Sequence, residues 1–291
     1  MQSEQMNIQW YPGHMTKTRR QIEADLKQVD AVCEIVDARI PFASRNPDID
    51  AICGEKPRIV ILNRMDLADP DTTRRWVAYF RSKGMAAVPT DCKTRRGIGD
   101  FQPAVRSLLK EKIERNAARG MNRPVRVMVV GIPNVGKSTL INQISGRKGA
   151  KAENRPGVTR GKQWVNVDSG LLLLDTPGIL WPKFEDPEVG MMLAYTGAVK
   201  DGILDVEELA CHLIGVLHRR YPQALKDRYG LEAEAGTPSY ELLEMAGRKR
   251  GYLVSGGEIN TERMAKVLLD EYRNGKLGRF TFEEPVEDEN V

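Results

Sequence analysis

The sequence has few of the residues from which metal centres, disulfide frameworks and membrane spans are built. Its four cysteines, Cys33, Cys53, Cys92 and Cys211, form no C-x-x-C pair, so neither a zinc ribbon nor a redox dithiol is indicated. Cys33 and Cys53 lie among apolar residues and are expected in the core. No apolar stretch approaches the ~20 residues of a membrane helix, and no apolar signal core begins the chain. We therefore expect reduced thiols, no membrane-spanning segment and a cytoplasmic location.

The net charge of +4 is also low for 291 residues, so total charge gives little reason to expect an anionic partner. The distribution of charge is more informative. Between Lys93 and Pro124, nine Lys and Arg residues stand against three Asp and Glu residues, whereas the end of the chain is acidic. A basic surface of this kind suits contact with phosphates, although a charge run is more often a solvated face.

Apolar runs alternate with helix-like segments over the first 180 residues or so. The runs are 31–36, 58–62, 125–130 and 171–174, and the helix-like segments are 16–30, 71–83 and 98–119. Continuous apolar runs are typical of buried parallel strands, so we predict an α/β domain over residues 1–186. After about Pro187 the periodicity is helical, at 206–217, 240–246 and 261–272. Residues 187–291 are therefore predicted to form a smaller, mostly helical domain.

Residues Gly131–Ser138 match the phosphate-binding pattern G-x-x-x-x-G-K-[ST] between a predicted strand and a predicted helix. In that context the glycines let main-chain N–H groups surround phosphate oxygens, and the helix N-terminus favours negative charge. Lys137 is expected to reach the β- and γ-phosphates, and Ser138 to supply a hydroxyl to Mg²⁺. The alternative is a glycine-rich turn that binds no ligand.

Two further residues are placed to complete a phosphate and Mg²⁺ site. Asp175 begins the sequence D-T-P-G directly after a predicted buried strand, where its carboxylate can act as a second-shell Mg²⁺ ligand. The N–H of Gly178, at the end of that tetrapeptide, can meet the γ-phosphate, although D-T-P-G alone is equally a plain turn. Thr159 lies between the two motifs and can complete the Mg²⁺ shell only when a γ-phosphate is present, as in an order–disorder switch.

The segment Asn63-Arg-Met-Asp66 follows the apolar run 58–62 and predicts a guanine site. Guanine offers N1–H and N2–H₂ donors, which one carboxylate can accept together, and adenine lacks this pattern. Asp66 is therefore expected to select guanine, with Asn63 bracing the loop and the base. The usual motif has a lysine where this chain has Arg64, whose aliphatic stem can lie along the base in the same way. An N-x-x-D turn without a ligand is the alternative.

The base motif here precedes the phosphate motif, which reverses the order found in most GTPases. Domain termini often lie close together, so a fold can be cut and rejoined elsewhere without moving its site. The basic segment 98–123 would be the joining segment. A second loop against the base is expected one β–α unit after the first, at Cys92 and Lys93, although that segment departs from the usual S-A-K pattern.

In combination these motifs closely resemble the circularly permuted GTPases of the YlqF/RbgA type, the ribosome biogenesis GTPase A family. The resemblance covers nearly the whole chain and is specific because several motifs occur in one order. The segments that carry it are Trp10–Met15, Val36–Pro41, Asn63–Asp66, Gly131–Thr139, Pro156–Thr159, Asp175–Pro182 and Gly275–Gly278.

The resemblance implies a role in late maturation of the large ribosomal subunit. It implies that GTP favours binding to the subunit precursor, through rRNA and ribosomal proteins, and that the particle stimulates hydrolysis, which leads to release. It also implies an RNA-contacting helical domain and a K⁺ ion on Asn134. We expect a monomer. The expected GTP- or GDP-binding residues are Asn63, Arg64, Asp66, Cys92, Lys93, Asn134, Val135, Gly136, Lys137, Ser138, Thr139, Thr159 and Gly178.

The group that orients the attacking water is not given by the usual motif. Many GTPases have a glutamine after D-x-x-G, whereas Ile179 follows Gly178 here and cannot orient water. Among the three histidines, His212 and His218 lie at amphipathic positions of the helical domain and are expected to be structural. His14, in a Pro-Gly turn before a helix, is the candidate catalytic residue, and the resemblance favours it. The alternative is a turn histidine with a structural role.

Two other functions remain open from the sequence. A nucleic-acid-binding assembly factor could use its nucleotide site only as a structural switch, with slow turnover that ribosomal particles do not affect. A P-loop ATPase is the second, and Asp66 argues against it. Basic residues of the helical domain could face RNA, although six acidic residues share the same stretch, 240–280. These basic residues are Arg248, Lys249, Arg250, Arg263, Lys266, Arg273, Lys276 and Arg279.

Overall fold

A computed structural model of the protein describes residues 20, 22–146, 163–168, 170–178, 186–199 and 205–286. The described residues fall into two compact units, one within Met1–Glu185 and Phe280–Val291 and the other within Asp186–Arg279. The sequence-based division at residue 187 lies next to the start of the second unit. It differs at the end of the chain, because residues 280–286 belong to the first unit, and residues 280–283 are hydrogen-bonded to its loops.

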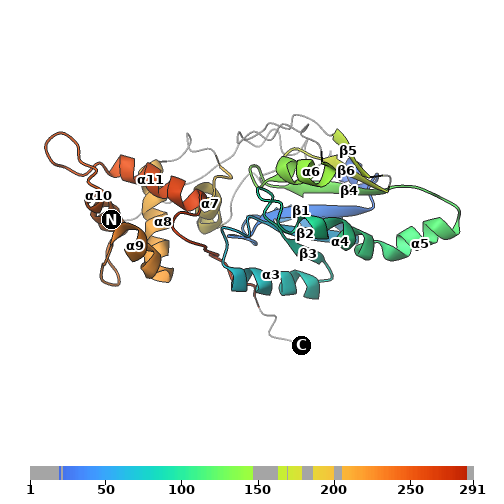
Figure 1. The fold of residues 1–291 in the computed structure, drawn as a ribbon, viewed down its shortest axis with the longest axis horizontal. Helices are drawn as coiled ribbons and strands as arrows, with labels where there is room; N and C mark the ends of the chain where they lie inside the picture. The colour runs from blue at the N-terminus through green and yellow to red at the C-terminus, as the bar shows by residue number, and fades with distance from the viewer. Residues whose placement is uncertain are drawn as a thin grey trace. The chain divides into compact units, whose positions relative to one another are not determined.

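One six-stranded sheet organises the first unit, in the order β3-β2-β1-β4-β6-β5 (Figure 1). Its strands are β1 (Ala31–Asp37), β2 (Arg58–Asn63), β3 (Ala86–Pro89), β4 (Val125–Gly131), β5 (Gln163–Asp168) and β6 (Leu171–Asp175). All neighbours pair in parallel except β5 and β6, which are antiparallel. The four apolar runs predicted from the sequence are confirmed as strands. Each strand extends one residue beyond its apolar run, to Asp37, Asn63, Gly131 and Asp175 respectively.

The first unit also contains helices, which lie between the strands in the sequence. They are α2 (Asp48–Cys53), α3 (Pro70–Ser82), η1 (Ile98–Asp100), α4 (Phe101–Leu108), α5 (Lys110–Ala118) and α6 (Lys137–Ser145), and residues 22–26 are also helical. Every residue of β1 is buried, so both faces of the sheet are covered at its centre. Residues 22–26 and α2 contribute to one apolar cluster with β1, β4 and β6, and α3 contributes Trp76 and Phe80 to another.

The helix-like segment predicted at 98–119 is confirmed, but as η1, α4 and α5 rather than as one continuous helix. Leu109, with φ −108° and ψ 16°, leaves the helical region and separates α4 from α5. Phe101 and Val105 of α4 are buried, whereas α5 buries none of its residues. Apolar periodicity ends after α4, so the second half of the segment has helical composition without a face to bury.

The sheet order explains how a permuted chain builds one site. If the strands are numbered from β4, the strand of the phosphate motif, and the count continues from β6 to β1, the order from the antiparallel edge becomes 2-3-1-4-5-6. The order of strands reverses between β4 and β1, and ligands of doubly wound folds bind at the carboxyl ends of the strands at such a point. The base strand β2 and the phosphate strand β4 are both adjacent to β1.

The second unit is helical, as predicted. Its helices are α7 (Pro187–Tyr195), α8 (Val206–Arg220), α9 (Pro222–Tyr229), α10 (Ser239–Lys249) and α11 (Thr261–Arg273), and α8 contacts the other four. Asp205 caps α8 by accepting the N–H groups of Glu207 and Glu208, and Asn260 caps α11. The three predicted helices are confirmed as α8, α10 and α11. In neither unit does a described helix combine the length and apolar character needed to cross a membrane.

Candidate nucleotide-binding site

The carboxyl ends of the parallel strands meet at one edge of the sheet, and the predicted site residues lie there. The register pairs Asp37 at the end of β1 with Asn63 at the end of β2. It also pairs Val129 of β4 with Asp175 at the end of β6. Because these strands run in the same direction, the loops that follow them surround the point where the strand order reverses.

The phosphate loop follows β4 and leads directly into α6, which begins at Lys137. A side chain at Gly131 would place its Cβ 2.6 Å from the carbonyl oxygen of Ile35, so only glycine lets β4 end this close to β1. The N-terminus of α6 presents main-chain N–H groups, and Ser138 and Thr139 occupy its first turn, half-buried. The arrangement is that of an anion site at a helix N-terminus.

Lys137 and Asp175 form a buried pair of opposite charge beside this loop. The Lys137 Nζ donates to the carbonyl oxygens of Gly131 at 3.0 Å and Ile132 at 2.9 Å. Burial lowers the pKa of Lys137 to about 8, although Asp175 acts in the opposite direction. Burial raises the pKa of Asp175 to about 6, against the opposing effect of Lys137. Both shifts show that these charges are poorly solvated.

One oxygen of Asp175, Oδ1, is buried and has no hydrogen-bond partner among the described residues. An unpartnered buried carboxylate oxygen is costly, and a cation would offset that cost. The next residue, Thr176, donates its hydroxyl to the carbonyl oxygen of Val129 at 2.7 Å and fixes the start of the D-T-P-G loop. Asp175 therefore fits the predicted Mg²⁺ role.

The D-T-P-G loop also lies against the phosphate loop. A Cβ added at Gly178 would lie 2.9 Å from the Lys137 Nζ and 3.0 Å from the main chain of Pro133. The structure thus brings together Gly178, Lys137 and Asp175, as the sequence predicts. Three residues of the sequence argument, His14, Thr159 and Ile179, lie outside the described residues.

Asn63 connects three loops through its side-chain amide. Its Nδ2 donates to the carbonyl oxygen of Val135 in the phosphate loop at 2.7 Å. Its Oδ1 accepts the N–H of Cys92 at 3.1 Å and the hydroxyl of Thr90 at 3.4 Å, both in the loop after β3. Asn63 is 4% exposed, so these bonds are shielded from water. Asn63 thus holds its own loop against the phosphate loop and the second base-side loop.

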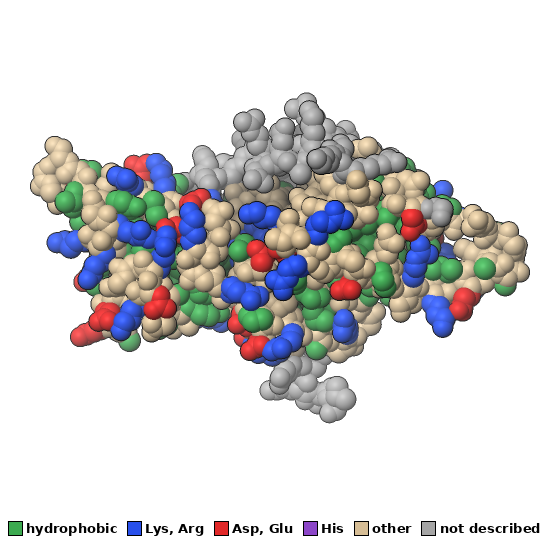
Figure 2. All heavy atoms as spheres, in the orientation of Figure 1, with side chains coloured by type: hydrophobic (Ala, Val, Ile, Leu, Met, Phe, Trp, Pro, Cys, Tyr) green, Lys and Arg blue, Asp and Glu red, His purple; other side chains and the backbone are tan. Residues whose placement is uncertain are grey.

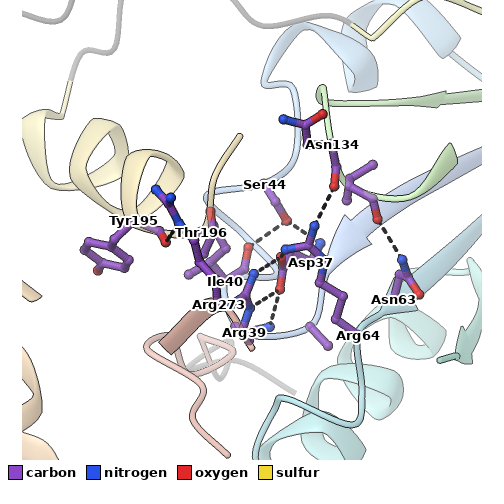
Figure 3. A network of polar contacts seen from close by, with 12 residues as sticks. Asp37, Arg39, Ile40, Ser44, Asn63, Arg64, Asn134, Tyr195, Thr196 and Arg273 are labelled. Carbon is purple, nitrogen blue, oxygen red and sulfur yellow. Dashed lines mark hydrogen bonds and ion pairs between the residues drawn. The ribbon is translucent and has the colours of Figure 1, made fainter. Parts of the chain in front are cut away.

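Arg64 lies in the left-handed region, with φ 62°, and its guanidinium points to the phosphate loop (Figure 3). Its Nη2 donates to the carbonyl oxygen of Asn134 at 2.6 Å, and its Nη1 donates to Asp37 at 3.2 Å. Asn134 is also left-handed, with φ 58°. Besides a stem that can lie along a base, Arg64 therefore ties the base motif to the phosphate motif.

Sequence reasoning assigned no role to Asp37 and Arg39, which the structure places at the centre of this network (Figure 3). Arg39 donates to Asp37 through Nε at 2.9 Å and through Nη2 at 2.8 Å. Burial opposes ionisation of Asp37, but Arg39 and then Arg64 outweigh it, so its pKa lies below the ordinary value. The signal was present in the sequence, because Asp37 ends an apolar run at the same position as Asn63 and Asp175 end theirs.

Asp66, the predicted guanine-reading residue, is half-buried on the loop after β2. Its pKa is raised, first by burial and then by the neighbouring carboxylate of Asp91. Hydrogen-bond donors from a ligand would stabilise the ionised form and reverse this shift. Asp66 is thus a half-buried carboxylate that lies near another carboxylate.

The second base-side loop holds Cys92 and Lys93. The Cys92 side chain is 2% exposed, and burial raises the pKa of its thiol to about 12, so the thiol is protonated at neutral pH. The Lys93 side chain is exposed, and its N–H donates to Asp91 at 2.9 Å. At Cys92 the contact with the neighbouring loop is made by a main-chain group, because the N–H of Cys92 donates to Asn63.

Three comparisons relate the chain to known proteins. The 50S ribosome-binding GTPase family matches residues 126–237. The chain is 48% identical to ribosome biogenesis GTPase A of Priestia megaterium, over 98% of this chain and 99% of that protein. It is 33% identical to mitochondrial ribosome-associated GTPase 1 of Mus musculus, over 95% of this chain and 90% of that protein. The crystal structure of GNP-bound YlqF from T. maritima aligns with a TM-score of 0.62 and 30% identity, covering 94% of this chain and all of that one.

Proposed function

The chain belongs to the ribosome biogenesis GTPase A family, and we propose that it binds the precursor of the large ribosomal subunit in its GTP state and leaves after hydrolysis. It is a GTPase with the P-loop fold in permuted order. The observation that carries the proposal is the 48% identity to ribosome biogenesis GTPase A over 98% of this chain. Within the site, the hydrogen bond from Asn63 to Val135 joins the base loop to the phosphate loop.

Guanine recognition is assigned to Asp66, with Asn63 and Arg64 shaping its loop. The N1–H and N2–H₂ groups of guanine can both donate to one carboxylate, and such charge-assisted bonds are about twice as strong as neutral ones. The raised pKa of Asp66 supports this, because burial and then the like charge of Asp91 outweigh the protein groups that stabilise its ionised form. Cys92 and Lys93 are proposed to border the base through their main chain.

The phosphates and Mg²⁺ are assigned to the loop after β4. Lys137 would exchange its two carbonyl acceptors for β- and γ-phosphate oxygens, and Val135, Gly136 and Thr139 would offer main-chain N–H groups. Ser138, Asp175 and Thr159 would hold Mg²⁺, which would offset negative charge during phosphoryl transfer. The unpartnered Oδ1 of Asp175 supports this assignment. We also propose that Asn134 binds K⁺, as the resemblance to the family implies.

Water activation is assigned to His14, since the residue after Gly178 is the apolar Ile179. A neutral imidazole can accept a hydrogen bond from water, and its unperturbed pKa of about 6.5 suits neutral pH. A positioned general base is typically worth roughly 10²–10⁴ in rate. His14→Ala is therefore expected to lower particle-stimulated turnover in that range while GTP affinity stays nearly constant. Equal turnover of the two proteins would show that the catalytic group comes from the particle or from K⁺.

RNA contact by the helical unit is supported only in part by its surface. Several basic side chains of the predicted patch have partners within the unit: Arg250 pairs with Glu271, Lys266 with Glu262 and Lys276 with Asp270. Arg248 and Lys249 are exposed at the end of α10. On the face in Figure 2, basic and acidic side chains are interspersed. We propose that the helical unit contacts RNA phosphates over a limited area, and that shape complementarity and contacts with ribosomal proteins add to this binding. We also propose that the protein is a cytoplasmic monomer.

The test is co-sedimentation with large-subunit precursors in the presence of GDP or a non-hydrolysable GTP analogue, with hydrolysis measured in parallel. We expect more protein in the pellet with the GTP analogue, faster hydrolysis with particles, and weaker pelleting as salt rises. Lys137→Ala is the control, because it should remove the nucleotide dependence. Equal pelleting in both states, with turnover that particles do not change, would instead support the RNA binder whose nucleotide site is only a structural switch.

A further inference from the structure

After the helical unit, the chain returns to the first unit at residues 280–283, which we call the return segment. Figure 1 shows this part of the chain, in dark red, passing beside α3. Phe280, Thr281 and Phe282 are 4%, 3% and 6% exposed, so the segment is buried like core despite having no regular secondary structure. No nucleotide motif includes it, and the burial calls for a reason.

The return segment is hydrogen-bonded to the loop that carries the guanine-reading carboxylate, residues 64–69. The N–H of Phe280 donates to the carbonyl oxygen of Leu67 at 2.9 Å. The hydroxyl of Thr281 accepts the N–H of Asp69 at 3.1 Å. Two consecutive residues of the return segment therefore hold the second half of this loop.

With these bonds, the main chain is held by hydrogen bonds on both sides of Asp66. On its N-terminal side, the N–H of Met65 donates to the carbonyl oxygen of Thr90, at 3.1 Å, in the loop after β3. On its C-terminal side, the carbonyl of Leu67 is held by the return segment. The main chain on either side of Asp66 is thus attached to a different segment, and one of the two attachments comes from the far end of the chain.

The same segment also holds the loop after β1. The Thr281 hydroxyl donates to the carbonyl oxygen of Ala38 at 3.3 Å, and the N–H of Phe282 donates to the carbonyl oxygen of Arg39 at 2.8 Å. Arg39 holds Asp37, the carboxylate that receives the arginine of the base motif. One hydroxyl, that of Thr281, therefore bridges both loops that shape the base side of the site.

Glu283 fixes the end of the contact. Its carboxylate accepts the N–H groups of Phe42 at 2.7 Å and Ala43 at 2.9 Å, and its carbonyl accepts the indole N–H of Trp76 at 3.0 Å. The following residue, Glu284, reaches only the surface of α3, where it pairs with Arg75 and is about half exposed. The structural contribution of the segment thus ends between Glu283 and Glu284.

We propose that the return segment is a positioning element of the guanine site, in which Thr281 fixes the loop 64–69 so that Asp66 can accept both guanine donors. The inference rests on the proposed function, which assigns base recognition to Asp66. Thr281 does not touch the nucleotide in this scheme. It acts through the loop, so its removal should affect the recognition of the base more than the binding of the phosphates.

GDP and IDP separate these two contributions. Hypoxanthine keeps the N1–H donor of guanine but lacks the 2-amino group, whereas the phosphates are the same. A well-placed carboxylate therefore prefers GDP, and a displaced one loses part of that preference. A residue that only stabilises the fold would change the affinities for GDP and IDP by the same factor.

The experiment compares wild type, Thr281→Val, Thr281→Ser and Glu284→Gln, all as full chains, by calorimetric titration with GDP and IDP, and with ADP for wild type. Thr281→Val keeps the shape and removes the hydroxyl, so GDP affinity should fall about threefold to tenfold, with a smaller fall for IDP. Thr281→Ser should restore the preference, because it restores the hydroxyl. Glu284→Gln, directly after the return segment, should leave both affinities unchanged, because among the described residues its carboxylate pairs only with exposed Arg75.

Two results would overturn the inference, and they are distinguishable. If wild type prefers GDP and Thr281→Val keeps the same GDP-to-IDP ratio, the return segment is only structural and the base assignment stands. If wild type binds GDP, IDP and ADP equally, the base assignment itself is wrong. Should Thr281→Val fail to fold, Glu283→Gln provides the second test, since it weakens the acceptor for Phe42 and Ala43 and should lower the ratio in the same direction.

Discussion

The side-chain amide of Asn63 donates a hydrogen bond to the main-chain carbonyl of Val135, 2.7 Å away and 72 residues later in the chain. Through its other atom, Oδ1, Asn63 also accepts the N–H of Cys92. A buried amide that is satisfied on both sides is costly to disturb. This relationship makes the base loops and the phosphate loop one structure, whichever motif comes first in the sequence.

The Asn63–Val135 bond depends on the absence of a side chain at Gly136. A Cβ at Gly136 would overlap the Asn63 Nδ2, and the residue has φ 108°, which L side chains rarely adopt. We expect Gly136→Ala to lower the free energy of unfolding by about 2–3 kcal/mol and to weaken GDP binding at least tenfold. Thermal unfolding and calorimetric titration measure the two effects.

A double-mutant cycle separates the overlap from backbone strain at Gly136. Asn63→Ala removes the amide that the new methyl group would meet, so Gly136→Ala should cost less in that background. The remaining cost is that of the left-handed backbone. Strictly additive effects of the two substitutions would show that the contact with Asn63 is not what requires glycine.

The core of the fold could be predicted because its physical signals are local. Continuous apolar runs gave four of the six strands, and the residues that terminate them, such as Asn63 and Asp175, were identified with the site. The strands β3 and β5 are short or half-exposed, so their sequences carry no continuous apolar run. The helix-like segment 98–119 is divided at Leu109, and the part that follows, α5, buries none of its residues.

The connections between motifs could not be predicted, because they depend on tertiary hydrogen bonds. Nothing in the residues 280–283 indicates that they return to the loops after β1 and β2. Likewise, the pattern N-x-x-D places Arg64 on a base but does not reveal that its guanidinium reaches Asn134 and Asp37. Sequence periodicity reports which face of an element is buried, and it does not report which loop of another element covers it.

The base assignment predicts a change of nucleotide preference for Asp66→Asn. An amide in place of the carboxylate can still accept one hydrogen bond, but it also donates. GTP should bind more weakly, and xanthosine triphosphate, which has an acceptor where guanine has N2–H₂, should bind comparatively better. Competition titrations with both nucleotides measure this exchange. If Asp66→Asn weakens both nucleotides by the same factor, Asp66 does not read that edge of the base.

The phosphate assignment predicts that Lys137→Ala loses nucleotide affinity without losing the fold. The substitution removes charge-assisted bonds to the β- and γ-phosphates, so GTP affinity should fall by roughly a hundredfold. Near neutral pH, the variant without nucleotide should unfold at the same or a higher temperature than wild type, because it no longer buries a poorly solvated ammonium. Thermal unfolding with and without GTP checks both statements. Unchanged affinity would refute the phosphate assignment.

The buried pair of Lys137 and Asp175 predicts how stability depends on pH when nucleotide and Mg²⁺ are absent. The folded pKa of Asp175 is raised to about 6, so its stabilising contribution is complete below its unfolded value and is lost as pH rises through about 6. The folded pKa of Lys137 is lowered to about 8, so its contribution is complete only above its unfolded value and is lost as pH falls through about 8. Around neutral pH both groups are charged and both penalise folding.

Comparing Lys137→Ala and Asp175→Asn with wild type over pH 4–10 isolates these contributions. Relative to wild type, Asp175→Asn should gain stability as pH rises from about 4 to about 6, because it no longer buries a carboxylate that must ionise. Lys137→Ala should lose its stability advantage over wild type as pH rises above about 8, where the wild-type amine becomes neutral in the folded protein.

Nucleotide phosphates would keep Lys137 charged, so GDP binding at pH 8–9 should take up protons. Calorimetry in buffers of different ionisation enthalpy detects this uptake. Stability differences that are flat over both pH windows, together with no proton uptake, would show that the two groups are solvated and that burial does not control their charge.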